Sequence, residues 1–135
     1  MVDVSGKEPT LRTATAQGML TCQAETLDRV RAGTTPKGAV IETAELAGVM
    51  AAKRTAELIP LCHPLPLTSI VVRIEIDDSL PGFRVRSEVR TKAETGVEME
   101  ALTAVAVACL TLFDMLKAVD GTMIVGGIEV TSKTK

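Results

Sequence analysis

Residues 69–89 read SIVVRIEIDDSLPGFRVRSEV, with apolar and polar side chains alternating in both halves. Alternation with a period of two is typical of a strand that buries one face. It predicts strands at 69–77 and 83–89, and the polar segment between them predicts a turn. Together the two strands predict an antiparallel hairpin, with Arg84 and Arg86 on its outer side.

A long apolar helix is predicted directly after this hairpin, at residues 97–119. Apolar side chains lie nearly all round it, so it is expected to be buried on more than one side. In a chain of this size we expect the sheet to cover one side and a second subunit to cover another. A final strand is predicted at residues 123–130.

The N-terminal half gives weaker signals. Residues 1 to about 12 are polar and predict a loose arm, and weak alternation predicts a strand from residue 18 to about 30. Residues 33–38 predict a loop. Thr43 is the predicted N-cap of a helix that ends near Glu57.

The order strand, helix, strand, strand, helix, strand indicates the fold class. It predicts an α+β, ferredoxin-like sandwich, in which an antiparallel sheet packs against two main helices. The length of 135 residues predicts one domain over the whole chain.

Composition excludes several classes of function. The net charge of −2 gives no basic field for nucleic acid, and Phe83 and Phe113 are the only aromatic residues that could stack on bases. The three cysteines form no CxxC pair, so we expect core-packing free thiols in a reducing cytoplasm. Glu98 and Glu100 open the apolar helix, which argues against a membrane span.

The only histidine lies in the segment Leu61-Cys62-His63-Pro64-Leu65-Pro66. Two prolines stiffen this connector between a predicted helix and a predicted strand. A histidine held there is either a catalytic group or a satisfied structural residue. No further histidine and no ligand-spaced cluster accompany Cys62 and His63, so no metal site is predicted.

Asp114 and Lys117 are three residues apart on the apolar helix and therefore share one face. They are either a surface ion pair near the helix end or a partly buried acid/base pair, and the lack of a polar face favours the second interpretation. Thr95 and Glu98 fit a capping box, which leaves Glu100 as the functional carboxylate.

Distance along the helix separates these candidate groups. Glu100 and Lys117 lie roughly 25 Å apart at about 1.5 Å per residue. Both groups cannot contact one small substrate within one subunit, so a site that uses both is shared between two chains. Arg12, Lys37 and Lys133 are solvated surface charges by default, although they could supply local positive charge together with Arg73, Arg84 and Arg86.

Three segments resemble one family: KRT (53–55) with LIPLCHP (58–64), TGVEMEALTA (95–104) and DMLKA (114–118). The family is cyclic pyranopterin monophosphate synthase, from molybdenum cofactor biosynthesis, and the resemblance extends over essentially the whole chain. It implies a ferredoxin-like subunit, a homohexamer built as a trimer of dimers, and an active site at the dimer interface. It also implies conversion of 3′,8-cyclo-7,8-dihydroguanosine 5′-triphosphate to cyclic pyranopterin monophosphate, with release of pyrophosphate.

The resemblance also implies roles for individual residues. The catalytic pair is matched by Asp114 and Lys117, the other basic site residues by His63, Lys37, Arg12 and Lys133, and the substrate-contacting segments by Leu61, Cys62, His63, Met99 and Glu100. Leu116 departs from the family, which often has cysteine there. The family also continues beyond the position of Lys135 into a Gly-Lys-Ser-Gly tail.

Two other functions remain open from the sequence. The first is a noncatalytic, oligomeric ligand-binding module, because ferredoxin-like folds serve many functions. The second is a metal-dependent nucleotide cyclohydrolase, which the lone histidine disfavours. No resident cofactor is expected, although Mg²⁺ could accompany a triphosphate substrate.

Overall fold

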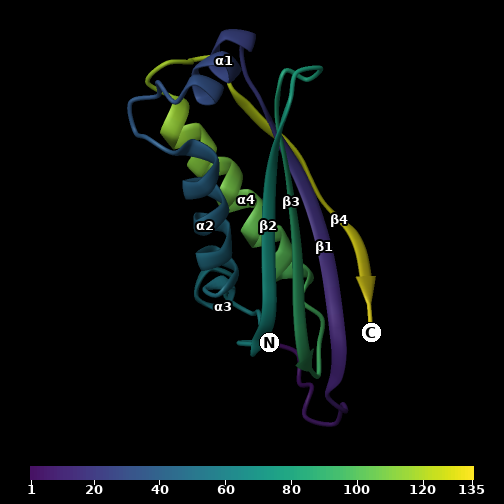
Figure 1. Cartoon of the computed structure of the whole chain (residues 1–135). Coiled ribbons are helices and arrows are strands. Elements are labelled where there is room, and N and C mark those ends of the chain that lie inside the picture. The colour runs from purple at the N-terminus through teal and green to yellow at the C-terminus, as the bar shows by residue number, and fades with distance from the viewer.

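The computed structural model describes residues 1–135 and shows one antiparallel sheet with helices on one of its faces (Figure 1). The elements are β1 (Thr10–Thr21), α1 (Ala24–Ala32), α2 (Val40–Ala52), α3 (Thr55–Leu58), β2 (Leu67–Asp77), β3 (Gly82–Ala93), α4 (Glu98–Leu116) and β4 (Ile124–Thr134). The strands lie in the order β2-β3-β1-β4. This arrangement confirms the predicted ferredoxin-like α+β sandwich.

The predicted hairpin is formed by β2 and β3, which pair antiparallel from Leu67 opposite Thr91 to Asp77 opposite Gly82. The apolar set of β3 faces the helices and is fully buried at Phe83, Val85 and Val89. The alternating pattern therefore predicted both the pairing and the face that forms the core.

Gly82 begins β3 and lies opposite Thr21, the last residue of β1. A Cβ atom at this position would lie 2.1 Å from the backbone oxygen of Leu20 and 2.9 Å from the Cα atom of Thr21. Backbone atoms cannot move aside as a flexible side chain can. We expect Gly82→Ala to lower the free energy of unfolding by about 3 kcal/mol, measured by urea denaturation. Gly121→Ala is the control, because a Cβ there meets no atom within 4 Å.

The predicted long helix is α4, which packs beside α2 on the same face of the sheet (Figure 1). Its inward residues Ala101, Ala104, Val105 and Ala108 are fully buried. By length and composition alone α4 could cross a membrane. However, 56% of its apolar 18-residue stretch is buried inside the protein, as in the core helix of a globular domain. A stripe of apolar side chains on its outward side remains exposed to differing degrees.

Two predictions for residues 10–32 are wrong. β1 begins at Thr10, inside the predicted arm, and the chain becomes helical at Ala24, inside the predicted strand. The alternation of β1 continues by chance into α1, and α1 buries only Thr26 and Leu27. α1 is nine residues long and mostly polar, so it offers few apolar side chains from which a helix can be recognised.

The helix predicted from Thr43 also has different bounds. α2 begins at Val40 with Ala39 as its N-cap, and Thr43 donates a hydrogen bond from its hydroxyl to the Ala39 carbonyl oxygen inside the first turn. α2 ends at Ala52, and the separate short helix α3 precedes Pro60. The predicted loop at residues 33–38 is confirmed.

Candidate active site

A cluster of three charged side chains, the lysine cluster, lies at one end of α4. Lys37 Nζ is 2.8 Å from Asp114 Oδ2, and Lys117 Nζ is 2.9 Å from Asp114 Oδ1. Lys37 comes from the loop after α1, whereas Asp114 is in the last turn of α4 and Lys117 is the C-cap of that helix. The fold thus brings Lys37, which the resemblance implies is a basic site residue, to the pair formed by Asp114 and Lys117.

The lysine cluster is exposed in the single chain. The prediction that Asp114 and Lys117 are partly buried is therefore wrong for the isolated subunit. The side chains of Asp114 and Lys117 are 54% and 58% exposed. Leu112, Met115 and Leu116 take the inward side of the last turn, which leaves the polar residues facing outward.

The electrostatics of the lysine cluster are set by Asp114. Hydrogen bonds from Lys37 and from Lys117 lower the pKa of its carboxyl to about 2. Asp114 is therefore ionised at neutral pH and a weak base, and it holds two ammonium groups side by side. Such a pair is suited to binding an anionic substrate and to donating a proton.

The histidine connector lies near the other end of α4. His63 Nε2 is 2.7 Å from the carbonyl oxygen of Val2, which can only accept a hydrogen bond. Nε2 therefore carries a proton in this arrangement, and Nδ1 is the nitrogen available to accept one. A groove of about 470 Å³ beside the ring is lined by residues that include Val4, Lys7, Leu61 and Met99.

Glu100 is the buried carboxyl group behind this connector. It is 3% exposed, its Oε2 atom has no hydrogen-bond partner, and its Oε1 atom accepts a hydrogen bond from Cys62 Sγ at 3.8 Å. Burial raises the pKa of Glu100. Cys62 is only half-buried, unlike Cys22 and Cys109, so the prediction that Cys62 is a core residue is wrong.

The pKa of Glu100 makes stability depend on pH. The folded chain holds this proton more tightly than the unfolded chain, so stability is full below the unfolded value of about 4.5 and falls as pH rises through the raised pKa. We expect Glu100→Gln to be more stable than the parent chain by about 1 kcal/mol at pH 8 and similar to it at pH 4. Urea denaturation at the two pH values measures the difference, and an equal difference at both would contradict the assignment.

Arg12 and Lys133 line an adjoining hollow of about 260 Å³, which shares Gly96 and Glu98 with the histidine groove. The Arg12 guanidinium donates hydrogen bonds to the carbonyl oxygens of residues 93 and 94, at 3.4 and 3.2 Å. Lys133 Nζ is 3.5 Å from Glu98 Oε1. Both basic groups therefore lie near the connector, at the opposite end of α4 from the lysine cluster.

The predicted capping box is wrong. The N-cap of α4 is Val97, without a side-chain hydrogen bond, and Glu98 is the first helical residue. The first helical hydrogen bond runs from Ala101 N to Val97 O. The N-cap therefore lies two residues later than the predicted N-cap, Thr95. Glu98 is consequently free to contact Lys133.

Sequence reasoning missed two groups near the connector. The N-terminal arm supplies Val2 and Lys7 to the histidine groove, and Lys53 lines a small hollow together with His63 and Glu100. Val2 and Lys7 give no local signal, because they reach the connector only through the tertiary fold. Lys53 does have a signal, because it lies in the KRT segment that carries the family resemblance. No three His, Cys, Asp or Glu side chains come together as a metal-binding group.

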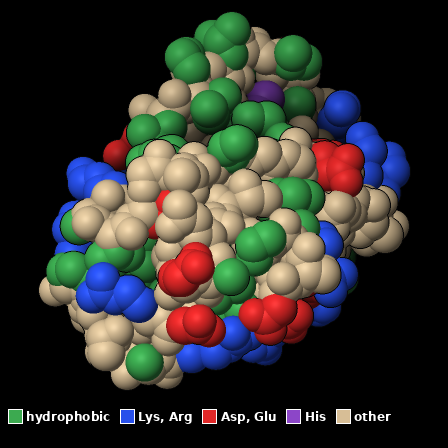
Figure 2. Space-filling model, turned by 90° about the horizontal axis from the view of Figure 1, so that it is seen from above, with side chains coloured by type: hydrophobic (Ala, Val, Ile, Leu, Met, Phe, Trp, Pro, Cys, Tyr) green, Lys and Arg blue, Asp and Glu red, His purple; other side chains and the backbone are tan.

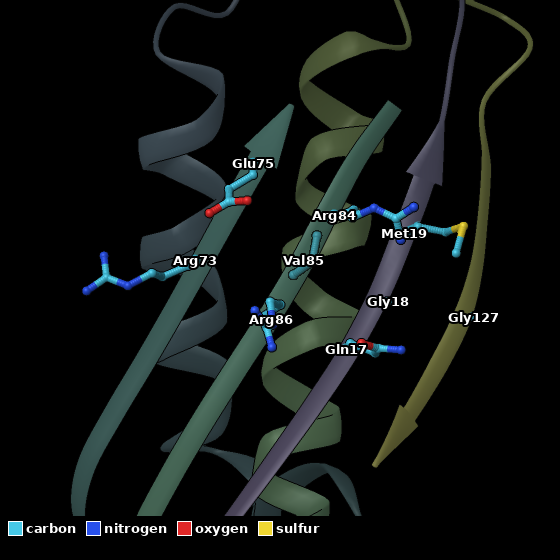
Figure 3. Close-up of a pocket in the computed structure, with 9 residues that line it drawn as sticks. All are labelled: Gln17, Gly18, Met19, Arg73, Glu75, Arg84, Val85, Arg86 and Gly127. Atoms are coloured by element: carbon cyan, nitrogen blue, oxygen red, sulfur yellow. The ribbon is translucent and has the colours of Figure 1, made fainter. Parts of the chain in front are cut away.

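The outer face of the sheet carries a separate pocket, away from the helices (Figure 3). Arg73, Arg84 and Arg86 line it together with Glu75, as expected for the outer side of the hairpin. Arg84 is paired with Asp77 at 2.6 Å. On the face seen in Figure 2, acidic and basic side chains are interspersed and form no continuous basic surface.

The two clusters of predicted site residues do not meet within one chain. α4 is continuous from Glu98 to Leu116, so Glu100 and Lys117 are separated by roughly 25 Å along the helix. One end of α4 has His63, Glu100, Arg12 and Lys133, and the other end has the lysine cluster.

Comparison with known proteins places this arrangement in a family. The model of the MoaC family matches residues 1–135. The cyclic pyranopterin monophosphate synthase of Nostoc sp. (strain PCC 7120) is 56% identical over 134 residues, which cover 99% of this chain and 80% of that protein. The protein of the same name from Brucella ovis is 57% identical over 134 residues, covering 99% and 81%. The chain therefore belongs to the MoaC family of enzymes.

Proposed function

We propose that the protein converts 3′,8-cyclo-7,8-dihydroguanosine 5′-triphosphate to cyclic pyranopterin monophosphate and releases pyrophosphate, as a step of molybdenum cofactor biosynthesis. Relatives that are 56% and 57% identical over 134 residues carry the name of this synthase. The observation that carries the proposal is the lysine cluster, in which the fold joins Lys37 to a helix 77 residues further along the chain.

The proposed chemistry divides between the two ends of α4. Lys117 donates and accepts protons while the purine-derived ring opens and recloses, and Asp114 orients its amine. Asp114 has the orienting role because a carboxyl with a pKa of about 2 is too weak a base at neutral pH. Lys37, Arg12 and Lys133 bind the triphosphate, and the contacts of Leu61, Cys62, Met99 and Glu100 hold the rest of the substrate.

Closure of the cyclic phosphate is assigned to the histidine connector. A ribose hydroxyl oxygen attacks the nearest phosphorus, a new P–O bond forms, and the P–O bond to the departing pyrophosphate breaks. His63 takes the hydroxyl proton at Nδ1, because Nε2 already donates to Val2. The basic residues offset the charge that develops on the leaving group.

The site is proposed to lie between two copies of the chain. The outward side of α4 carries the apolar stripe Met99, Leu102, Ala106, Leu110 and Phe113, at spacings of three and four residues. Two such stripes can pack antiparallel about a two-fold axis near Ala106. The connector end of one copy then meets the lysine cluster of the other, and each dimer has two complete sites.

The remaining proposals concern assembly and location. We infer a homohexamer made of three such dimers, acting in the cytoplasm, where the free thiols of Cys22, Cys62 and Cys109 stay reduced. Mg²⁺ is expected only as a companion of the triphosphate, because it needs few protein ligands.

Leu110→Glu tests the α4 stripe. Leu110 is 61% exposed, and a charge there would be buried against the second copy. We expect the hexamer to give way to a smaller species in analytical ultracentrifugation, because the α4 contact within each dimer is lost, and we expect loss of turnover. Leu46→Glu on α2 is the matched control, because Leu46 is also 61% exposed but lies outside the stripe. A Leu110→Glu protein that keeps the assembly state of the parent protein and stays active would rule out this packing.

Product analysis tests the proposed function. The purified protein is given the cyclic dihydroguanosine triphosphate under anaerobic conditions, with and without a chelator. We expect one pyrophosphate for each cyclic monophosphate pterin identified by mass. Substrate binding without pyrophosphate release would instead indicate a noncatalytic ligand-binding module. Loss of all activity in chelator would support a metal-dependent reaction.

A further inference from the structure

We propose that Asp120 is a positioning residue for the lysine cluster, a role that rests on the proposed function of that cluster. Asp120 follows α4 by four residues and is only 4% exposed. It acts through the two segments that carry Lys37 and Lys117.

The Asp120 carboxylate accepts four hydrogen bonds. Its Oδ2 atom accepts from Gln23 N at 2.9 Å and Thr26 Oγ1 at 2.7 Å, and its Oδ1 atom accepts from Thr122 N and Thr122 Oγ1, both at 2.7 Å. Gln23 is the N-cap of α1 and has no side-chain cap of its own. Asp120 therefore caps α1 from 97 residues away, and its negative charge suits a helix N-terminus.

α1 depends on this cap for its placement. Only Thr26 and Leu27 of its nine residues are buried, so apolar packing holds it weakly. The Asp120 bonds thus supply a large part of the attachment of α1 to the rest of the protein. Burial raises the pKa of Asp120, but its hydrogen bonds outweigh this effect and lower it to about 2, so the cap is ionised at neutral pH.

The position of α1 determines the position of Lys37 through two hydrogen bonds between the end of this helix and the loop that follows it. The Arg29 side chain donates a hydrogen bond to the Thr34 carbonyl oxygen at 2.7 Å, and Thr34 N donates to the Arg29 carbonyl oxygen at 3.1 Å. These bonds fix the start of the loop to the last turn of α1. Lys37 follows three residues later and reaches Asp114.

The other segment is fixed by the backbone of Asp120 itself. Asp120 N donates a hydrogen bond to the Leu116 carbonyl oxygen at 3.1 Å, which ties it to the helix end that carries Asp114 and Lys117. Asp120 therefore fixes the position of Lys37 relative to Asp114 and Lys117. Small misplacements of reacting groups are costly in catalysis.

Two threonine hydroxyls at the same distance from Asp120 offer a matched test. Thr26→Val removes a bond to α1, whereas Thr122→Val removes a bond to the segment before β4. We expect Thr26→Val to lower kcat about tenfold and Thr122→Val to leave kcat unchanged. Added to Lys37→Ala, Thr26→Val should cause no further loss, because its effect passes through Lys37. A further tenfold loss in that background would show a merely structural role.

A second readout does not depend on activity. The lysine amines are labelled by ¹³C reductive methylation, and the Lys37 signal is assigned with Lys37→Arg. We expect Thr26→Val and Asp120→Asn to move this signal toward its position in Asp114→Ala, and Thr122→Val to leave it in place. An unmoved signal in Thr26→Val would overturn the proposal. A moved signal in a protein without pyrophosphate release would support the positioning role while refuting the proposed function.

Discussion

Lys117→Ala is expected to lower pyrophosphate release about a thousandfold, which is the typical contribution of a positioned proton donor. Lys117 is the one group of the lysine cluster assigned to proton transfer, and the remaining lysine cannot replace it because Lys37 bonds the other oxygen of Asp114. The measurement is single-turnover formation of the pterin product under anaerobic conditions.

The fold of the Lys117→Ala protein should be unaffected. Lys117 is 58% exposed, and exposed ion pairs contribute little to stability. Lys92→Ala, on the outer face of β3, is the control and should turn over normally. Normal turnover by Lys117→Ala would remove Lys117 from the mechanism, whereas a changed assembly state would make the variant uninformative about chemistry and require Lys117→Arg in its place.

The parts of the fold that the sequence predicted are those with a strong local period. Phe83, Val85 and Val89 alternate with arginines, and this alone predicted β3, its pairing and its buried face. α1 was mistaken for a strand because it buries two residues and is held by a carboxylate from the far end of the chain. The local sequence of α1 gives no sign of that contact.

The candidate site divides in the same way. The Asp114–Lys117 pair follows from helix geometry, and the structure shows its ion pair at 2.9 Å. The contact of Lys37 with Asp114 and that of Val2 with His63 join residues 77 and 61 positions apart, so they depend on the tertiary fold. The exposure of the lysine cluster was mispredicted because an apolar helix can direct its few polar residues outward.

Mixing two inactive chains should restore activity if the site is shared. One chain carries Lys117→Ala, and the other carries Arg12→Ala together with His63→Ala, so each has one intact end of α4. After random reassembly, a site formed by two copies receives both intact ends in about one quarter of cases. The same mixture contains no intact site if both ends belong to one chain.

Complementation is therefore the most direct measurement of the shared site. Equal amounts of the two chains are unfolded, mixed and refolded together, and pyrophosphate release is compared with each chain refolded alone and with the unmodified protein. We predict recovery of about one quarter of the unmodified rate from two chains that are each inactive. A mixture that is well folded and assembled but as inactive as its components would contradict a site built from opposite ends of α4 in two copies.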